Sequence, residues 1–217
     1  MRVVMIAAST VCGRISPAVM GSSLDRRRLE QARAATDASL MGAATLRRAD
    51  PEMKAGSGPI ADGRIRAIIS DSGDVPVQGK KLFATGGQPI VFTGCNQHEA
   101  LAAALAGQAR IIALPLGPGG LSIVAAIIEL GKLGASSVLI EGGARLNYSC
   151  LAQGVVDEIL LTVTPFISGD RSAAALADGN GPLGQPFLPL ELLSCEPVET
   201  GELFLRYRVI KDNHNVR

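Results

Sequence analysis

The sequence predicts an α/β fold with a mixed, mostly parallel central sheet and antiparallel strands near the carboxyl end. Over the first two thirds of the chain, short apolar runs alternate with helical patterns, which is typical of βαβ units. In the last third, two strand-like runs follow each other without a convincing helix between them, so we expect them to pair antiparallel. The chain has 217 residues, of which 47% are hydrophobic, and this suits a single domain over residues 1–217.

The strands expected in the first two thirds are short apolar runs bounded by glycine or polar residues. They are Val3–Ala8, Ala38–Met41, Ile65–Ile69, Pro89–Phe92, Arg110–Leu114 and Ser137–Ile140. The start of the chain has one positive charge and only a short apolar run, so we interpret it as a strand rather than a signal peptide.

Helical patterns lie between these runs. The expected helices are Leu24–Thr36, Asn96–Ala106, Leu121–Leu130 and one that follows Gly143 to about Cys150. Ser22 stands three residues before Asp25, which resembles a capping box at the start of the first helix. Pro118-Gly119-Gly120 is expected to open the third helix.

The last third contains the two strands expected to be antiparallel neighbours, Glu158–Val163 and Glu202–Ile210. Between them, Thr164–Pro189 is rich in Gly, Pro, Ala and Asp and is expected to be a long loop. Lys54–Gly63 has the composition of a second loop, which lies within the domain.

Charge and composition argue against several classes of function. The net charge of +1 leaves no electrostatic footprint for nucleic acid. The apolar runs are far shorter than the roughly 20 residues of a membrane helix. The four cysteines lack the paired spacing of a structural zinc site, so we expect no metal and free thiols in a reducing compartment, the cytoplasm.

The strongest local signal is the segment SSVLIEGGARLN, where a hydrophobic strand ends in Gly142-Gly143 and a helix begins at once. Glycine lets a ligand approach the backbone closely, and the amides at a helix start favour an anion such as phosphate. Arg145 would lie in the first helical turn and add a charge-assisted contact. The alternative is a tight strand-to-helix turn without a ligand.

A second signal is the segment ASLMGAATLRRADP, where a strand ends at Gly42 before small residues and Thr45. Small side chains leave room for a flat ring or a diphosphate, to which a threonine hydroxyl can donate. Close packing of helix and strand is the alternative. Arg47 and Arg48 can reach a phosphate, although adjacent arginines usually point apart and at least one is expected to be solvated.

Arg33 borders the apolar stripe of its helix, whereas the run Arg26–Arg28 is expected to be a solvated face. A partly buried arginine requires an anionic partner, and a carboxylate and a substrate phosphate remain equal alternatives. The adjacent carboxylates Asp157 and Glu158 point to opposite faces of a strand, so we interpret them as structural.

Four segments in order resemble the reductase domain of riboflavin biosynthesis, both the carboxy-terminal half of the bifunctional deaminase/reductase and its stand-alone relatives. They are STVCGRIS, ARAATDASLMGAATLRRADP, VLIEGGARLN and GVVDEILLTVTPFISG. The resemblance implies a dihydrofolate-reductase-like fold with three α/β/α layers, a homodimer, and a reductase without the deaminase domain.

The resemblance implies an NADPH-dependent reduction that turns the ribosyl group of a ribosylaminopyrimidine 5′-phosphate into a ribityl chain. The implied cofactor-binding residues are Ala8, Ser9, Gly42, Thr45, Gly142, Gly143, Ala144, Arg145 and Leu146. The implied substrate-binding residues are Arg33, Asp50 and Glu141. Asp71 or Ser72 is expected to border the cofactor as well. For the proton donor, Glu141, Asp50 and an ordered water remain alternatives.

Three departures from the family pattern affect the substrate side. Cys12 stands where the family has Asp in its first loop, and Ala49-Asp50-Pro51 keeps one acid where two are usual. A phosphate-binding arginine is also missing from the residues that follow. Another small carbonyl, imine or pteridine-like substrate is therefore an alternative, and a non-catalytic nucleotide-binding protein is a second one.

Overall fold

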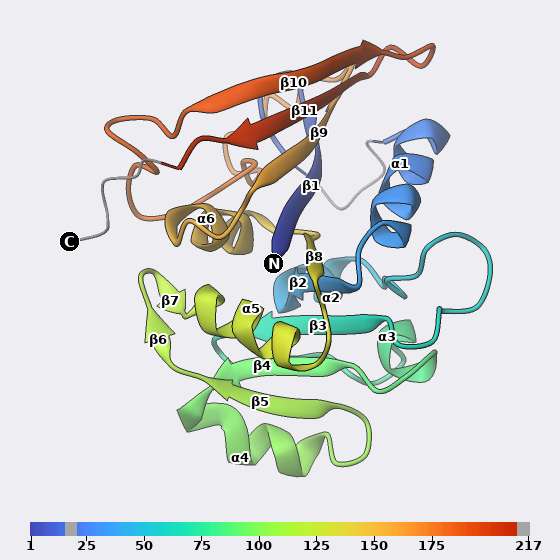
Figure 1. Ribbon diagram of the computed structural model, residues 1–217, viewed down its shortest axis with the longest axis vertical. Helices are drawn as coiled ribbons and strands as arrows, with labels where there is room; N and C mark the ends of the chain where they lie inside the picture. The colour runs from blue at the N-terminus through green and yellow to red at the C-terminus, as the bar shows by residue number, and fades with distance from the viewer. Residues whose placement is uncertain (16–20, 212–217) are drawn as a thin grey trace.

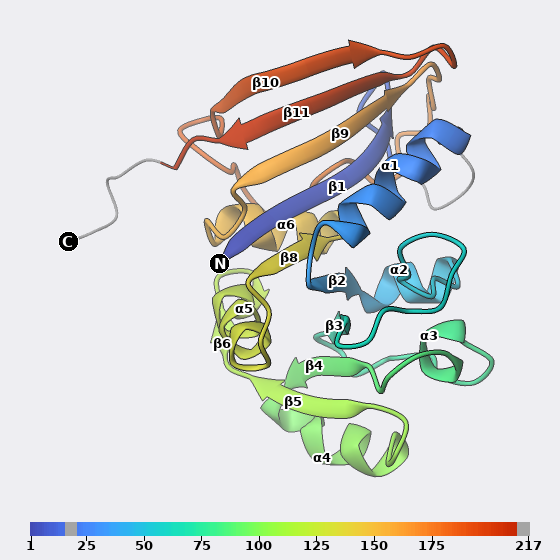
Figure 2. The same ribbon diagram turned by 45° about the vertical axis from the view of Figure 1, so that its right-hand side comes forward.

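The sheet is the centre of the molecule. The computed structural model describes residues 1–15 and 21–211, so Ser16, the last residue of the STVCGRIS segment, lies outside the described part. Within that part, nine strands form one sheet in the order β10-β11-β9-β1-β8-β2-β3-β4-β5 (Figures 1 and 2). They are β1 Arg2–Thr10, β2 Ala38–Gly42, β3 Ile65–Ser70, β4 Ile90–Gly94, β5 Arg110–Leu114, β8 Ser137–Ile140, β9 Glu158–Thr164, β10 Leu190–Pro197 and β11 Leu203–Val209.

The pairing of the strands confirms the predicted sheet. All neighbours from β9 to β5 run parallel, and β11 pairs antiparallel with both β9 and β10. Because parallel strands end at the same edge, the carboxyl ends of β1, β8, β2, β3 and β4 lie side by side (Figure 2).

Helices cover both faces of the sheet and complete the three predicted layers. They are α1 Ser23–Ala34, α2 Ala43–Arg48, α3 Lys81–Ala84, α4 Cys95–Ala104, α5 Ile123–Lys132 and α6 Ala144–Ala152. The chain crosses from β1 to β5 with α1 to α4 and returns with α5 and α6, so right-handed crossovers place the two groups on opposite faces. Met5 accordingly shares a core cluster with Leu130 of α5, whereas Val4 shares one with Ala32 of α1. Among the helices of residues 1–15 and 21–211, none has the length and apolarity to cross a membrane.

The helix predicted to begin at Leu121 begins later. Gly120–Leu121 is a short strand, β7, that pairs with β6, Leu116–Gly117, and α5 starts at Ile123. The Ser122 hydroxyl accepts a hydrogen bond from the amide of Ala125 at 3.1 Å. This cap sets the helix start, and the glycines before it form a hairpin instead.

Strand β10 was not predicted because its residues lack a buried face. All of them are exposed except Leu193, which is half-buried. Its position is determined by the antiparallel ladder with β11, in which Leu190 lies opposite Val209 and Pro197 opposite Leu203. An edge strand stabilised by backbone hydrogen bonds leaves a weak apolar alternation in the sequence.

The capping box predicted for α1 forms only in part. The Ser22 hydroxyl accepts hydrogen bonds from the amides of Leu24 at 3.1 Å and Asp25 at 3.3 Å, as expected for an N-cap. The Ser22 amide, however, donates to the buried carboxylate of Glu202 at 2.8 Å instead of to Asp25. The carboxylate of Asp25 is therefore not used in the cap.

Arg28 departs from the solvated face predicted for its arginine run. Its guanidinium donates to the backbone carbonyls of Leu161 at 3.0 Å and Leu205 at 2.6 Å, and it lies over the ring of Phe204. These contacts attach α1 to β9 and β11.

Candidate active site

A cleft of about 860 Å³ opens at the carboxyl ends of the parallel strands. Its walls come from the residues that follow β2 and β3, from α2 and α6, and from the β6–β7 hairpin. The lining includes Gly42, Ala43, Arg47, Asp71, Ser72, Gly120, Arg145 and Leu146. In open α/β sheets, this edge is where ligands bind.

The turn Glu141–Gly143 follows β8 and is hydrogen-bonded to β2. The Glu141 amide donates to the carbonyl of Leu40 at 2.9 Å, and the Gly42 amide donates to the carbonyl of Gly142 at 2.8 Å. Gly142 has φ +81°, a conformation that favours glycine, and the Gly142–Gly143 peptide bond is cis. Helix α6 begins at Ala144 with no side-chain cap. Its first amides are therefore available to an anion.

Thr45 of α2 faces this turn. A Cβ atom added to Gly143 would lie 3.0 Å from the Thr45 hydroxyl oxygen, which is closer than side chains normally pack. The absence of a side chain at Gly143 therefore lets the Thr45 hydroxyl approach the backbone of the turn closely.

Ala8 and Ser9 belong to β1, the strand next to β8 in the sheet. Met5 of β1 is level with Ile140 of β8, so the end of β1 lies beside the Glu141–Gly143 turn. The predicted cofactor-binding residues thus lie on or after β1, β8 and β2, three neighbouring strands of the sheet. Of these residues, Gly42, Arg145 and Leu146 line the cleft, whereas Ala8, Ser9, Thr45, Gly142, Gly143 and Ala144 are not among its lining residues.

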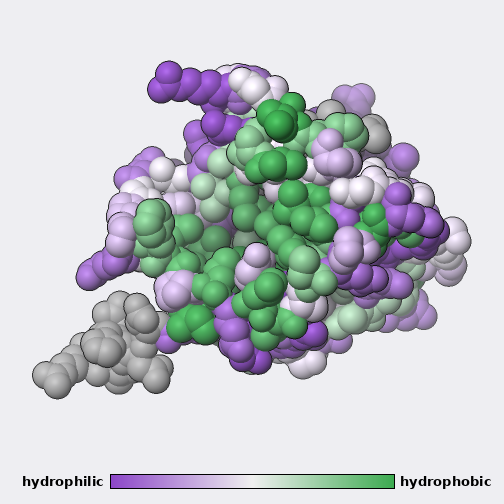
Figure 3. Space-filling model, turned by 90° about the horizontal axis from the view of Figure 1, so that it is seen from above, coloured by the Kyte–Doolittle hydropathy of each residue, from purple (hydrophilic) through white to green (hydrophobic). Residues whose placement is uncertain are grey.

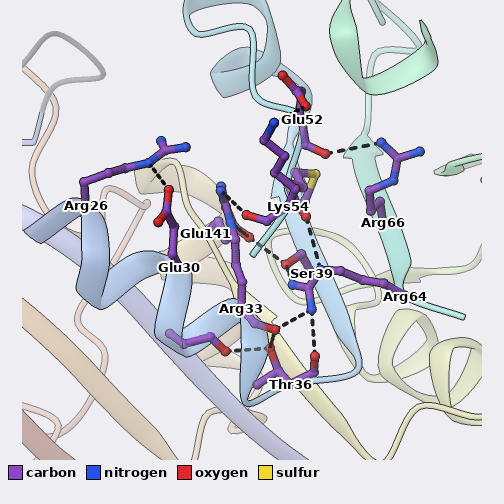
Figure 4. A network of polar contacts seen from close by, with 12 residues as sticks. Arg26, Glu30, Arg33, Thr36, Ser39, Glu52, Lys54, Arg64, Arg66 and Glu141 are labelled. Carbon is purple, nitrogen blue, oxygen red and sulfur yellow. Dashed lines mark hydrogen bonds and ion pairs between the residues drawn. The ribbon is translucent and has the colours of Figure 1, made fainter. Parts of the chain in front are cut away.

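The predicted anionic partner of Arg33 is a carboxylate of the protein itself (Figure 4). Arg33 Nη2 lies 2.5 Å from Glu141 Oε2, Arg33 Nε lies 3.0 Å from Glu141 Oε1, and both side chains are 3% exposed. The Ser39 hydroxyl also donates to Glu141 Oε1 at 2.6 Å. Two residues predicted to bind substrate are therefore engaged with each other, and their contact with a substrate stays a prediction.

Comparison with known proteins identifies the family of this chain. The model of the RibD C-terminal domain family matches residues 3–204. The chain belongs to the RibD C-terminal domain family. A relative from Methanothermobacter thermautotrophicus, named 2,5-diamino-6-ribosylamino-4(3H)-pyrimidinone 5′-phosphate reductase, is 28% identical over 186 residues, which cover 82% of this chain and 84% of the relative.

Solved structures confirm the predicted fold. A pyrimidine reductase-like protein from Corynebacterium diphtheriae superimposes with a TM-score of 0.77 at 21% identity, over 97% of this chain and 92% of that one. Dihydrofolate reductase from Enterococcus faecalis, in complex with NADP(H), gives a TM-score of 0.55 at 12% identity, over 97% of both chains. The dihydrofolate-reductase-like architecture inferred from the resemblance is therefore correct.

In this RibD C-terminal domain, three arginines hold one loop behind the site (Figure 4). The carbonyls of Glu52, Met53 and Lys54 accept hydrogen bonds from Arg66, Arg64 and Arg33 at 3.2, 3.1 and 3.1 Å, respectively. Met53 has φ +57° and is fully buried. Three cations on consecutive carbonyls explain how this loop keeps a backbone conformation that methionine rarely adopts.

Asp50 does not line the cleft of the RibD C-terminal domain. Its carboxylate accepts a hydrogen bond from the amide of Lys81 at 2.9 Å, at the start of α3. Its predicted contact with substrate is therefore not supported by a position in the cleft.

Asp25, in the first turn of α1, was predicted only as part of a helix cap. Burial raises the pKa of Asp25, and repulsion by Glu202 adds to the shift, against a hydrogen bond from Thr162 and the charge of Arg28. Thr162 pairs in register with Ala8, so Asp25 lies near the end of β1. The only sign of this residue in the sequence was an acid in the first turn of the predicted helix.

Cys12 follows β1 at the same end. Its thiol is exposed and lies 3.2 Å from the Thr10 hydroxyl. Hydrogen bonds from Thr10 and from the backbone of Ser168 and Gly169 lower the pKa of Cys12 to about 7. The residue that replaces the family Asp can therefore carry a negative charge near neutral pH. Within residues 1–15 and 21–211, no group of three or more potential ligands is arranged to hold a metal ion.

Proposed function

We propose that the protein is an NADPH-dependent reductase that converts a ribosylaminopyrimidine 5′-phosphate to its ribitylamino form in riboflavin biosynthesis. The cleft at the Glu141–Gly143 turn is the observation that carries the proposal, because it joins a glycine-lined space to the start of α6. The relative from Methanothermobacter thermautotrophicus, named for reduction of such a phosphate, supports the substrate class.

The residues of the cleft fit a dinucleotide. The Thr45 hydroxyl lies so close to Gly143 that a Cβ atom there would be 3.0 Å from the Thr45 oxygen, so the hydroxyl and the turn can contact the same diphosphate. The amides of Ala144 and Arg145 begin α6 and favour its negative charge. The Arg145 guanidinium lines the same part of the cleft.

A bound reduced nicotinamide supplies the hydride for the sugar carbon in its ring-opened, imine-like form. Ala8 is half-buried and has a short side chain that would let a flat ring approach the end of β1, and Ser9 is buried next to it. The ion pair between Arg33 and Glu141 holds the turn. Asp25 is the acid we propose to hold a proton near the end of β1, because it contacts Thr162, which pairs with Ala8, and because burial raises its pKa.

Purified protein tests the proposal with NADPH and the pyrimidine substrate. We expect NADPH oxidation that depends on the substrate, with a product two mass units heavier by mass spectrometry. NADPH binding without turnover would move the assignment to another small carbonyl, imine or pteridine-like substrate, which a substrate panel then identifies. A failure to bind any reduced dinucleotide would overturn the proposed function.

We also propose that the protein is a homodimer. Leu190 and Leu192 of β10 and Leu203 of β11 are 42%, 54% and 38% exposed, on one face of the sheet. Figure 3 shows hydrophobic residues gathered on the side of the molecule where β10 and β11 lie. Exposed apolar area of this kind supports contact with a second copy. Light scattering should give twice the chain mass, and Leu192→Glu should halve it; a monomeric wild type would contradict the homodimer.

The cytoplasm is the proposed compartment, with residues 1–217 as a single reductase domain. All four cysteines are free, which supports a reducing environment. Detection of the protein in a secreted fraction would contradict this placement.

A further inference from the structure

The strand order determines how a dinucleotide would cross the cleft. β1, β8, β2 and β3 are consecutive neighbours and run parallel (Figure 2). In the proposed function the nicotinamide lies at the end of β1 and the diphosphate at the turn between β8 and β2. The adenosine end then lies over the end of β3, roughly 14 Å from β1 at about 4.8 Å per strand.

One cationic side chain of the cleft lies at that end. Arg47, in the last turn of α2, lines the cleft together with Ser70, Asp71 and Ser72, which end and follow β3. Its Nη1 atom lies 3.0 Å from Asp74 Oδ2 and donates to the carbonyl oxygen of Asp74 at 2.6 Å. The loop after β3 thus fixes the guanidinium at the adenosine end.

We propose that Arg47 recognises the 2′-phosphate of NADPH and so sets the preference for NADPH over NADH. This inference rests on the proposed function and names the residue that distinguishes the two cofactors. The side chains of Arg47 and Asp74 are 40% and 68% exposed, so their ion pair contributes little stability and a phosphate can compete with it. Among contacts between described residues, Arg47 uses only Nη1, so Nε and Nη2 are available to phosphate oxygens.

The other arginines considered for this role lie elsewhere. Arg145 is in the first turn of α6, where its contact would be with the diphosphate that both cofactors share. Arg48 is adjacent to Arg47 in sequence but does not line the cleft. Two acidic residues line the cleft. Asp71 has a carboxylate oxygen 3.8 Å from where a Cβ atom of Gly120 would lie, and Asp178 accepts a hydrogen bond from the amide of Ala175 at 3.0 Å.

Asp74 has a second consequence for the cofactor preference. Its carboxylate holds the guanidinium in place, but it would repel a phosphate bound to the same group. We expect Asp74→Asn to keep the contact from Arg47 to the backbone carbonyl while removing the repulsion.

Calorimetric titration tests the inference with NADPH, NADH, 2′,5′-ADP and 5′-AMP as ligands. We expect Arg47→Ala to weaken binding of NADPH and 2′,5′-ADP by roughly 10- to 100-fold, while NADH and 5′-AMP stay within about twofold. Arg145→Ala should weaken both dinucleotides by the same factor, and Arg48→Ala is the matched control without effect. Asp74→Asn should strengthen only the ligands that carry the 2′-phosphate. Circular dichroism and thermal unfolding establish that each variant is folded.

Four results would overturn the inference. An equal loss for NADPH and NADH in Arg47→Ala would place Arg47 on a shared part of the cofactor, and no loss would remove it from the site. Tighter binding of NADH than of NADPH by the wild type would assign the cleft to the unphosphorylated ribose. Binding of neither dinucleotide would overturn the proposed function and the inference together, so the two failures are distinguishable.

Discussion

Arg33 of α1 and Glu141 at the end of β8 form a buried, two-point ion pair although 108 residues separate them in the sequence. Both side chains are withdrawn from water, and the pair connects the end of a helix to the turn below the cleft. We expect Arg33→Met and Glu141→Leu each to lower the free energy of unfolding by about 3–5 kcal/mol, because each leaves an unpaired buried charge.

The double variant provides the decisive comparison for this pair. Arg33→Met with Glu141→Leu removes both charges, so its loss in urea unfolding should be smaller than the sum of the single losses. Glu30→Gln, which breaks the exposed pair with Arg26, is the control and should cost less than about 1 kcal/mol. Additive losses would contradict a coupled pair.

The raised pKa of Asp25 predicts that the stability difference between Asp25→Asn and the wild type depends on pH. Because its pKa is raised in the fold, ionisation destabilises the native state as pH rises above the ordinary value of an aspartate. Asp25→Asn removes this penalty and can still accept the hydrogen bond from Thr162. We expect the variant to be relatively more stable at pH 8 than at pH 4, measured by thermal unfolding, while turnover falls. Asp62→Asn, in an exposed loop, should show no such trend; a constant difference for Asp25→Asn would refute the assignment.

Cys12 predicts a reactive thiol near neutral pH. Its pKa is about 7, so the rate of alkylation by iodoacetamide should rise with a midpoint near pH 7 rather than near 9. Cys12→Ser should abolish this phase. The buried Cys150 thiol, whose pKa burial raises, should not react in the folded protein. A midpoint near 9 would show that the hydrogen bonds around Cys12 do not form.

The close contact between Gly143 and Thr45 predicts that a side chain at position 143 weakens cofactor binding. Gly143→Ala places a methyl group 3.0 Å from the Thr45 hydroxyl, so that oxygen must move away from the turn. Loss of about one hydrogen bond to a diphosphate corresponds to a roughly tenfold weaker affinity for NADPH. Gly58→Ala is the control, since its Cβ atom meets nothing within 4 Å. Unchanged affinity in Gly143→Ala would exclude the turn from the cofactor site.

Local sequence carries the information for the two strand-to-helix turns near the cleft. The segments Glu141–Gly143 and Gly42–Thr45 were expected to end strands and start helices at a ligand site, and the structure brings both to one cleft. The role of Asp25 was not predicted, because its raised pKa depends on burial and on Glu202, which is distant in the sequence. Asp50 was assigned from a motif, and its cap on α3 depends on a fold that the motif does not describe.

The sequence by itself determined the alternation of strands and helices, the glycine turn and the need of Arg33 for an anion. Those features depend on periodicity, backbone freedom and the cost of burying a charge, all of which act over a few residues. Only the tertiary structure decided that this anion is Glu141, that Arg47 rather than Arg48 faces the cleft, and that β10 completes the sheet edge. These outcomes depend on which distant segments the strand order places side by side, and residue patterns within one segment do not record that order.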